Sequence, residues 1–324
     1  MHIPLYKYFS ELPWIPVIPI YGYTALRIKA LTSEEVLVNS SRHLEILDLY
    51  AQELNTDAIL PLLDLTVEAE VLGAEVSYPP HDAPIIKKHA ELEVILEGYK
   101  YTTLKMSEML KLVRKMVNFH SDKIKGFYVT GPFTVLTQAI GVEKTVRLMI
   151  REHSTFRDLM EKCTELCKKY LVDLQASGID FIIIADPSSA LLSSDQFESS
   201  SKPFLEELLD ESRVDVILHI CGKIQHLIDQ VIKIKNLSGV SVDQNISLRK
   251  LAEKVPKDFI MMGNYNPLRL AEAGQEDIQR EAVEMVREMI NYPNFVASTG
   301  CEIPSVTPIH NIKKFIQACK IKRF

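Results

Sequence analysis

The sequence lacks several features that would point to a particular class of partner. Basic residues do not exceed acidic ones: 37 Lys and Arg stand against 43 Asp and Glu, and the formal net charge is −6. The basic residues are scattered along the chain, which argues against a nucleic-acid surface. Neither G-x-G-x-x-G nor G-x-x-x-x-G-K occurs among the 12 glycines, so no phosphate-binding loop is predicted.

Long apolar runs are also missing. Near the N-terminus Pro13, Pro16 and Pro19 interrupt the one apolar stretch, and no basic segment precedes it. We therefore predict neither a signal peptide nor a membrane span. The five cysteines are few and odd in number, which argues against a disulfide framework and for a reducing compartment. A cytoplasmic protein is the expected result.

Two of the cysteines, Cys163 and Cys167, lie four residues apart, a spacing that would suit a metal pair on one face of a helix. They also belong to an apolar stripe with helical spacing, formed by Leu159, Cys163, Leu166, Tyr170 and Leu174. We favour packing in the core for both, and likewise for Cys319 near the end of the chain.

Short β-rich runs alternate with longer amphipathic stretches along the whole chain. The predicted strands are residues 15–21, 58–64, 126–131, 181–186, 215–221, 239–243, 259–264 and 295–300. Strands that alternate with helices form parallel sheets, and eight such units close most simply into a (β/α)8 TIM barrel. No internal repeat or linker divides the chain, so residues 1–324 are predicted to be a single α/β domain.

The segment from residue 77 to residue 105 is long for a connection in a barrel. It carries Pro79, Pro80 and Pro84 within a few positions of one another. Connections of this length are usually functional or mobile. We expect this segment to form a lid or a part of the barrel mouth.

The stretch 215–222 combines a strand pattern with metal-ligand side chains. Its apolar run leads to His219 and Cys221, which point the same way because side chains alternate along a strand. A second strand pattern ends at Gly300 and is followed by Cys301. If the two strand ends meet, His219, Cys221 and Cys301 form a three-ligand site suited to zinc, with one position open. Taken singly, each of these residues is more often part of a core.

Polar side chains also lie at the ends of the other predicted strands, where barrel enzymes place their active sites. These residues are Tyr21, Asp64, Asp186, Asp243 and Asn264, and Glu68 follows shortly after one of them. An acid at such a junction can instead cap the helix that follows, and Glu68 can be an ordinary acid of a first helical turn. For a fourth zinc ligand the candidates are Asp243, Glu302, a water or the substrate.

These motifs resemble the uroporphyrinogen decarboxylase superfamily, and within it the methylcobamide:coenzyme M methyltransferase branch. The similar segments cover nearly the whole chain and are residues 64–76, Gly131-Pro-Phe-Thr134, Ile184-Ala-Asp-Pro187, Leu218-His-Ile-Cys-Gly222, Val242-Asp-Gln244, Gly263-Asn264 and Gly300-Cys301, followed by Thr307-Pro308 and Asn311-Ile312. The resemblance implies that His219, Cys221 and Cys301 bind zinc. A more distant similarity to cobalamin-independent methionine synthase favours Asp243 as the fourth ligand.

The alternative activity is that of the decarboxylases themselves, which are carboxy-lyases acting on a tetrapyrrole. They carry Arg-Gln-Ala-Gly-Arg-Tyr at the first strand, whereas this chain has Pro19-Ile-Tyr-Gly-Tyr-Thr24. A polycarboxylate substrate needs cationic partners, and Arg27 is the one cation nearby in the sequence. Decarboxylation needs no metal and leaves the His and Cys residues unexplained, so the methyltransferase is favoured.

The implied reaction moves a methyl group from a methyl-corrinoid to a zinc-activated thiol such as coenzyme M, with another thiol or a folate left open as acceptor. Zinc suits this reaction because it deprotonates a bound thiol. The chain has no D-x-H-x-x-G corrinoid motif, so we expect the donor on a separate small corrinoid protein that docks at the barrel mouth. A zinc-stabilised scaffold without chemistry is the third alternative.

The remaining candidate residues are given roles in this reaction. We expect the carboxylates to orient ligands or handle the released proton, and these are Asp64, Asp186 and Asp243. Substrate binding is assigned to Tyr21, Glu68, Gln244 and Asn264.

Overall fold

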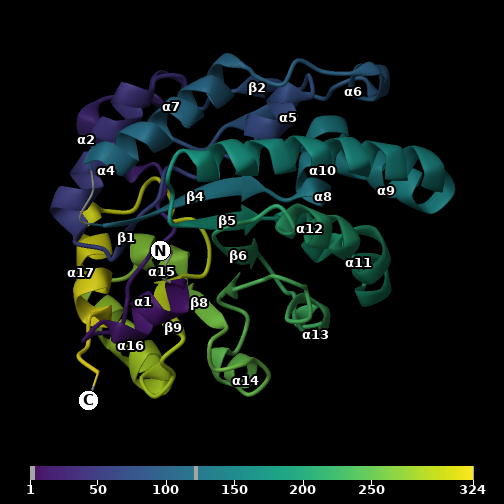
Figure 1. Ribbon diagram of the computed structural model, residues 1–324. Coiled ribbons are helices and arrows are strands. Elements are labelled where there is room, and N and C mark those ends of the chain that lie inside the picture. The colour runs from purple at the N-terminus through teal and green to yellow at the C-terminus, as the bar shows by residue number, and fades with distance from the viewer. Residues whose placement is uncertain (1–3, 120–122, 324) are drawn as a thin grey trace.

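The central sheet consists of seven parallel strands in the spatial order β1-β4-β5-β6-β7-β8-β9 (Figure 1). The computed structural model describes residues 4–119 and 123–323, so the outermost residues of the predicted unit 1–324 lie outside the described ranges. The strands are β1 (Ala58–Ile59), β4 (Ile124–Thr130), β5 (Phe181–Ala185), β6 (Asp215–Ile220), β7 (Gly239–Val242), β8 (Ile260–Tyr265) and β9 (Phe295–Thr299). Seven of the eight predicted strands are therefore confirmed.

The prediction of a regular first strand over residues 15–21 is wrong, although this segment lies where the eighth strand of the barrel belongs. Val17 forms an isolated parallel bridge with Ala297 of β9, and its carbonyl accepts a hydrogen bond from the Asp57 amide, next to β1. The segment thus joins the two edges of the sheet. Pro16 and Pro19 donate no backbone hydrogen bond, so a continuous ladder cannot form.

A proline also accounts for the shortening of the second predicted strand. The strand predicted over 58–64 is shortened to β1, because Pro61 interrupts the remainder of that segment. The 15–21 segment closes the sheet between its two edge strands, β1 and β9. The described chain therefore has the predicted (β/α)8 barrel architecture.

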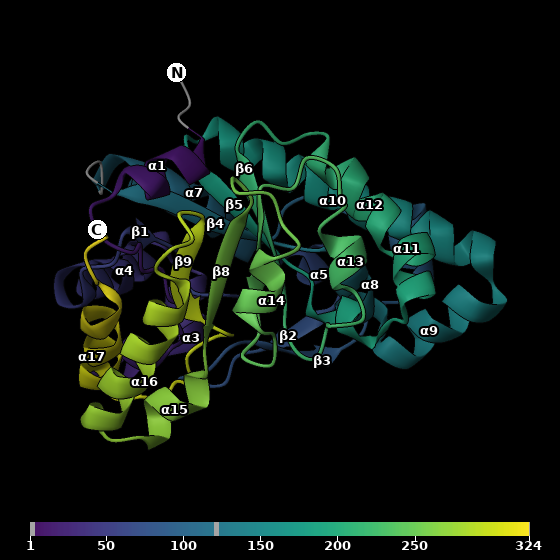
Figure 2. The same ribbon diagram turned by 90° about the horizontal axis from the view of Figure 1, so that it is seen from below.

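Helices cover the outer face of the sheet (Figures 1 and 2). Their bounds are α1 (Leu5–Glu11), α2 (Thr24–Lys29), α3 (Ser33–Leu37), α4 (Ser40–Leu54), α5 (Val67–Val71), α6 (Leu92–Glu97), α7 (Leu104–Phe119), α8 (Pro132–Ile140), α9 (Val142–Arg151), α10 (His153–Ala176), the 3-10 helix η1 (Pro187–Leu191), α11 (Ser194–Ser200), α12 (Lys202–Leu209), α13 (Ile228–Val231), α14 (Leu248–Ala252), α15 (Pro267–Glu272), α16 (Gln275–Met289) and α17 (Ile309–Cys319). Among the described residues, no helix is both long enough and apolar enough to cross a membrane.

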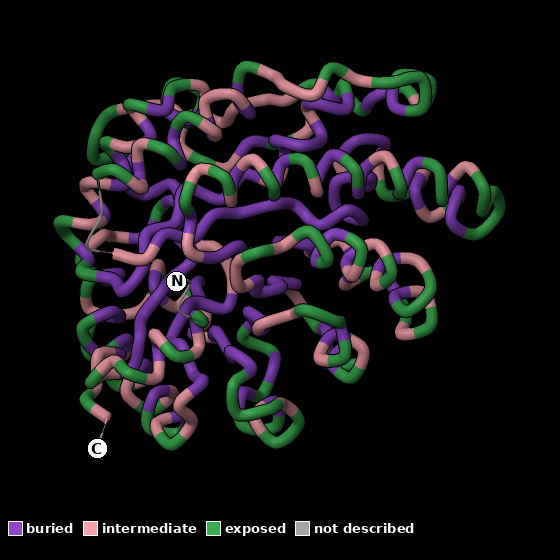
Figure 3. The backbone as a smooth tube through the Cα atoms, viewed as in Figure 1, coloured by how far each residue is buried: buried purple, intermediate pink, exposed green. Residues whose placement is uncertain are grey.

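The strands form the buried centre of the molecule, as the tube coloured by burial shows (Figure 3). Ile182, Ile183 and Ile184 of β5 are fully buried, because one face of the sheet packs on helices and the other fills the barrel. Cys163 and Cys167 are also fully buried on α10, which confirms the prediction that they belong to the core.

The long connection after β1 is a structured extension. It contains a two-stranded antiparallel hairpin, β2 (Glu75–Ser77) with β3 (Ile85–Lys88), and then α6. Figure 1 places α6 on the same side of the molecule as α9 and α11. Ser33 of α3 ties the hairpin turn to the body of the protein, because its amide and hydroxyl donate to the carbonyls of Pro80 and Pro79 at 2.8 and 2.6 Å.

Candidate metal centre

The centre is built from two strand ends that lie far apart in the sequence. His219 is on β6 and Cys221 directly follows that strand, so both side chains leave the strand end in one direction. Cys301 follows β9 after Gly300, whose position admits no side chain: a Cβ there would lie 2.5 Å from the Gln244 amide nitrogen. The segment that carries Cys301 therefore packs closely against the loop that follows β7.

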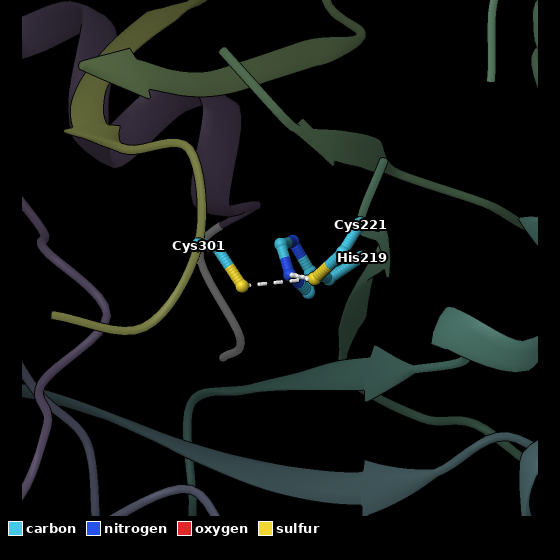
Figure 4. A group of neighbouring side chains, drawn as sticks. All are labelled: His219, Cys221 and Cys301. Carbon is cyan, nitrogen blue, oxygen red and sulfur yellow. Dashed lines mark hydrogen bonds between the residues drawn. The ribbon is translucent and has the colours of Figure 1, made fainter. Parts of the chain in front are cut away.

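The three side chains converge at the centre of the barrel mouth (Figure 4). The His219 Nε2 atom lies 2.8 Å from the Cys221 sulfur, and the two sulfurs of Cys221 and Cys301 are 3.0 Å apart. All three ligand atoms lie within 4.8 Å of one another, and His219 is buried. The sequence-based expectation that these residues meet is confirmed, and the cluster could hold a metal ion.

The chemistry of this donor set fits a metal. Both thiols are free, and a sulfur separation of 3.0 Å is well beyond the roughly 2.05 Å of a disulfide bond. Hydrogen bonds from Cys221 and His219 lower the pKa of the Cys301 thiol, while the pKa of Cys221 is raised because its proton is shared with Cys301. One thiolate is thus already favoured, and thiolate is the form that binds metal.

Ser241 of β7 fixes the orientation of the imidazole. Its hydroxyl lies 2.9 Å from His219 Nδ1, and the side chain is buried. With Nδ1 held by this contact, Nε2 faces the two sulfurs. Such partners of a metal-binding histidine set its ring orientation and the nitrogen that is left for the metal.

Replacing Ser241 by Ala should therefore weaken metal binding without removing a ligand. We expect the zinc dissociation constant to rise about 10- to 100-fold, measured by competition with a chromogenic chelator. Ser298→Ala is a matched control, because Ser298 is equally buried in β9 and its hydroxyl has no hydrogen-bond partner among the described residues. Equal affinities in the two variants would mean that Ser241 does not position the imidazole.

Asp243 and Asn264 organise the loop beside the centre. The Asp243 carboxylate accepts a hydrogen bond from the Asn245 amide at 2.9 Å, and the Asn264 side chain donates to the Asp243 and Ile246 carbonyls at 3.0 and 2.6 Å. The negative charge of Asp243 contributes to the raised pKa of Cys221, which places it near the sulfur. It is not among the three residues whose ligand atoms cluster.

Asp186 is enclosed by donors. Its carboxylate accepts hydrogen bonds from the Thr134 amide at 2.9 Å and from the hydroxyls of Ser189 and Ser201 at 2.5 and 3.4 Å. Burial nevertheless raises its pKa. These bonds join the segments that follow β4 and β5. The Asp186 amide also donates a hydrogen bond to the His219 carbonyl, so Asp186 connects these segments to β6.

Asp64 pairs with a lysine that the sequence analysis did not single out. Lys105 of α7 is fully buried, and its ammonium lies 3.0 Å from Asp64, 3.2 Å from Glu70 and 2.6 Å from the Thr66 hydroxyl. A signal was present, because Lys105 shares the buried face of α7 with Met109. Its charge is thus engaged by two carboxylates.

The predicted substrate-binding residues do not form one group. Tyr21 is buried, stacks on Tyr50 with ring centroids 4.6 Å apart and has its hydroxyl 2.5 Å from that of Thr56. Gln244 is exposed and lines a shallow cleft together with Asn264, on the loops after β7 and β8. The structure therefore separates Tyr21, in the core, from Gln244 and Asn264, at the surface.

Glu68 is a buried carboxyl inside the barrel wall. It accepts hydrogen bonds from the Thr130 amide and hydroxyl at 2.8 and 2.7 Å, yet burial raises its pKa from the ordinary 4.5 to about 7. The folded chain therefore binds this proton more tightly than the unfolded chain does. Its contribution to stability is greatest below about pH 4.5 and is lost as the pH rises through about 7.

Glu68→Gln should reduce the dependence of the free energy of unfolding on pH in this range. In the wild type we expect the free energy of unfolding to fall by roughly 3 kcal/mol between pH 4.5 and 7 because of this group, at about 1.4 kcal/mol per pH unit. Urea unfolding of both proteins across this range measures the difference. Parallel curves would contradict the assignment, and Glu276→Gln on the exposed start of α16 serves as the control.

Glu302 stands next to the centre, and in the sequence it appeared only as a candidate fourth ligand. Its Oε1 atom is buried and has no hydrogen-bond partner among the described residues. Burial, together with the negative charges of Cys301, Asp82 and Asp64, raises its pKa well above the ordinary value. An acid directly after a candidate ligand cysteine was the available signal for this residue.

Comparison with known proteins agrees with the geometry. A family model described as uroporphyrinogen decarboxylase (URO-D) matches residues 11–321. The methylcobamide:CoM methyltransferase MtbA of Methanosarcina acetivorans is 23% identical over 82% of this chain and 79% of its own length. The uroporphyrinogen decarboxylase of Thermodesulfovibrio yellowstonii is 26% identical over 70% of this chain and 68% of its own length.

A solved structure described as a methyltransferase from Methanosarcina mazei superposes with a TM-score of 0.86. It is 21% identical in sequence, and the match covers 97% of this chain and 96% of the other. At that identity the likeness supports the fold, and the barrel architecture described above is shared along nearly the whole chain.

Proposed function

This chain belongs to the uroporphyrinogen decarboxylase (URO-D) family, and we propose that within it the protein is a zinc-dependent methyltransferase. The methyl donor is a methyl-corrinoid and the acceptor is a small thiol. One observation carries this proposal: two thiols and an imidazole meet within 4.8 Å at the barrel mouth, where this fold places its active sites. That donor set suits zinc, and three protein ligands leave a position open.

His219, Cys221 and Cys301 would hold the metal, and Ser241 keeps the imidazole turned toward it. Bound zinc would supply a lowered pKa for the acceptor thiol, so that the sulfur is a thiolate at neutral pH. The acceptor sulfur then forms a bond to the methyl carbon of the donor. The cobalt–carbon bond breaks, and its electron pair stays on cobalt.

The carboxylates have different parts in this proposal. Asp243 is the candidate for a fourth ligand before the acceptor binds, because its charge acts on Cys221. Asp64 and Asp186 act as positioning residues: the first is paired with Lys105 and the second joins the loops after β4 and β5. Gln244 and Asn264 are proposed to contact the donor, since both line a surface cleft on the loops after β7 and β8.

The donor is proposed to arrive on a separate corrinoid protein. The chain contains no D-x-H-x-x-G corrinoid motif, so nothing in its sequence would carry the cofactor. A docking position at the mouth, near the β2–β3 hairpin and α6, would present the methyl group to the zinc-held thiol. A cytoplasmic location forms part of the same proposal, because free ligand thiols persist in a reducing compartment.

The second candidate is decarboxylation of a tetrapyrrole, which the URO-D relatives favour. In the segment that was predicted as the first strand, this chain has Pro19-Ile-Tyr-Gly-Tyr-Thr24 without an arginine, and the buried Lys105 is already paired with two acids. A substrate carrying many carboxylates would find few cations here. The three metal-type ligands also have no part in that reaction.

Thiol-dependent demethylation of methylcobalamin tests the proposal. Zinc-replete protein should turn over methylcobalamin only when a thiol is added, as followed by the change in the corrin absorbance, and chelator-treated protein should not. Uroporphyrinogen, offered to the same preparation, should lose no carbon dioxide. Failure of a zinc-replete protein to demethylate with any of a panel of thiols would reject the methyltransferase, and decarboxylation would establish the second candidate.

A further inference from the structure

Cys221 and Cys301 form a pair of reduced thiols in direct contact. Their sulfurs are 3.0 Å apart and face each other (Figure 4), and both cysteines are free. They follow two different strands, β6 and β9, and are 80 positions apart in the sequence, so the contact exists only in the folded chain. Two thiols held together in this way can be joined by an oxidant as well as by a metal.

The distance between the two sulfurs lies between the distances that these two states require. The sulfurs of a disulfide are about 2.05 Å apart. Two thiolates that share a tetrahedral zinc ion, each about 2.3 Å from the metal, are roughly 3.8 Å apart. The observed 3.0 Å is therefore within about 1 Å of either state. The two states exclude each other, because a disulfide leaves neither sulfur as a thiolate ligand.

The chain beside Cys221 has room for the movement that a disulfide requires. Gly222 has a φ of +95°, and outside its chain neighbours the nearest atom to a Cβ there would be the Ala190 Cβ, at 4.0 Å. The chain beside Cys301 is fixed instead, because Gly300 packs closely against the loop after β7. We therefore expect the Cys221 side chain and its loop to move by about 1 Å when the bond forms.

The pair is also within reach of a small oxidant. Cys221 and Cys301 are partly exposed, whereas Cys163, Cys167 and Cys319 are fully buried. Oxidation of a cysteine depends on access to its sulfur as well as on its thiolate character. A hydroperoxide added to the folded protein should therefore react at these two sulfurs first.

We propose that Cys221 and Cys301 are a modification site, at which a hydroperoxide forms a reversible disulfide that prevents metal binding. Hydrogen peroxide transfers one oxygen to the first sulfur, which becomes a sulfenic acid, and one water is released. The second thiol attacks that sulfur, the S–S bond forms, the S–O bond breaks and a second water leaves. Two thiols thus lose two electrons to one peroxide. The inference stands on the cysteine pair and does not depend on the proposed methyl transfer.

Peptide mapping of the full chain after treatment with hydrogen peroxide tests the proposal. Zinc-loaded and chelator-treated protein are each oxidised, alkylated to block the remaining thiols, and digested without reductant. In the chelator-treated protein we expect a cross-linked peptide pair that contains Cys221 and Cys301, and a loss of two of the five thiols. Zinc binding, read with a chromogenic chelator, should be lost in parallel. Dithiothreitol should reverse all of these changes.

Zinc should protect the pair, because only the metal-free fraction of the protein reacts. With free zinc at about ten times its dissociation constant, the cross-link should form roughly 10-fold more slowly. Cys319→Ala is the matched control, since it removes a buried thiol and keeps the pair, and it should give the same cross-link. Cys301→Ser should give no cross-link within the chain, and the sulfenic acid of Cys221 should then be trapped by dimedone.

Three results would overturn the proposal. One is a cross-link that joins other cysteines, such as Cys163 and Cys167. Another is a sulfinic or sulfonic acid on Cys221 or Cys301 in place of the disulfide. The third is an equal rate of cross-linking with and without zinc. None of these measurements involves methyl transfer, so an absence of methylcobalamin turnover would bear on the proposed function alone.

Discussion

Cys221→Ala and Cys301→Ala should each abolish zinc binding and methyl transfer together. Purified wild-type protein is expected to contain about one zinc per chain, and either variant close to none, because each removes one of the three ligands that cluster among the described residues. Loss of a hydrogen-bond partner of a metal ligand lowers metal affinity or activity about 10- to 100-fold. Loss of a ligand itself should therefore lower kcat/KM for thiol-dependent demethylation by more than ~100-fold. Elemental analysis and turnover are measured on the same preparations.

Cys319→Ala is the matched control for this experiment. Cys319 is fully buried in α17 and is not part of the cluster, so the change removes a buried thiol and leaves all three ligands. This variant should keep its zinc and its activity. A folded Cys301→Ala protein that retained a full complement of zinc would contradict the metal centre, and zinc retained alongside lost activity would separate binding from chemistry.

Lys105→Met should destabilise the fold more than any surface substitution. The variant leaves Asp64 and Glu70 without the ammonium that lies 3.0 and 3.2 Å from them, in a position where the lysine is fully buried. Removing one partner of a buried ion pair costs about 3–5 kcal/mol, because the remaining charge stays desolvated. Urea unfolding should show this loss as a lower midpoint with a similar slope.

Lys111→Met on the same helix provides the comparison. Lys111 pairs with Glu108 at 2.6 Å, but its side chain is 58% exposed, and such surface pairs contribute about 0–1 kcal/mol. Adding Asp64→Asn to Lys105→Met should recover part of the lost stability. A Lys105→Met protein as stable as Lys111→Met would show that water, and not the lysine, satisfies the two acids.

The metal centre could be predicted because its signals are local. A two-residue spacing puts His219 and Cys221 on one side of a strand end, and Gly300 before Cys301 repeats the arrangement of a strand followed by a glycine turn. The barrel could be predicted for a similar reason, since the alternation of strands and helices is a pattern along the chain. The wrong prediction of a strand over residues 15–21 also has a local cause. Prolines in and before this segment exclude a regular strand as well as a membrane span, and only the second consequence was drawn from the sequence.

The hydrogen bonds and ion pairs around the centre could not be predicted from local sequence patterns, because they depend on contacts between distant segments. Asp186 is occupied by Thr134 and Ser189, and only the packing of the loops after β4 and β5 brings these donors to it. Nor does any spacing pair Lys105 with Asp64, which is 41 positions away in the sequence numbering. A carboxylate at a strand end looks the same in sequence whether it is free or fully bonded.

The sequence by itself determined the barrel, the three candidate metal ligands and the absence of arginine from residues 19–24, since periodicity, residue type and spacing are properties of the chain. The tertiary structure alone decided which polar groups are satisfied. It paired Asp64 with Lys105, enclosed Asp186, and left Oε1 of Glu302 and the hydroxyl of Tyr128 without a hydrogen-bond partner among the described residues. The physical reason is that burial and hydrogen bonding depend on which groups surround an atom in space, and folding sets those neighbours across the whole chain.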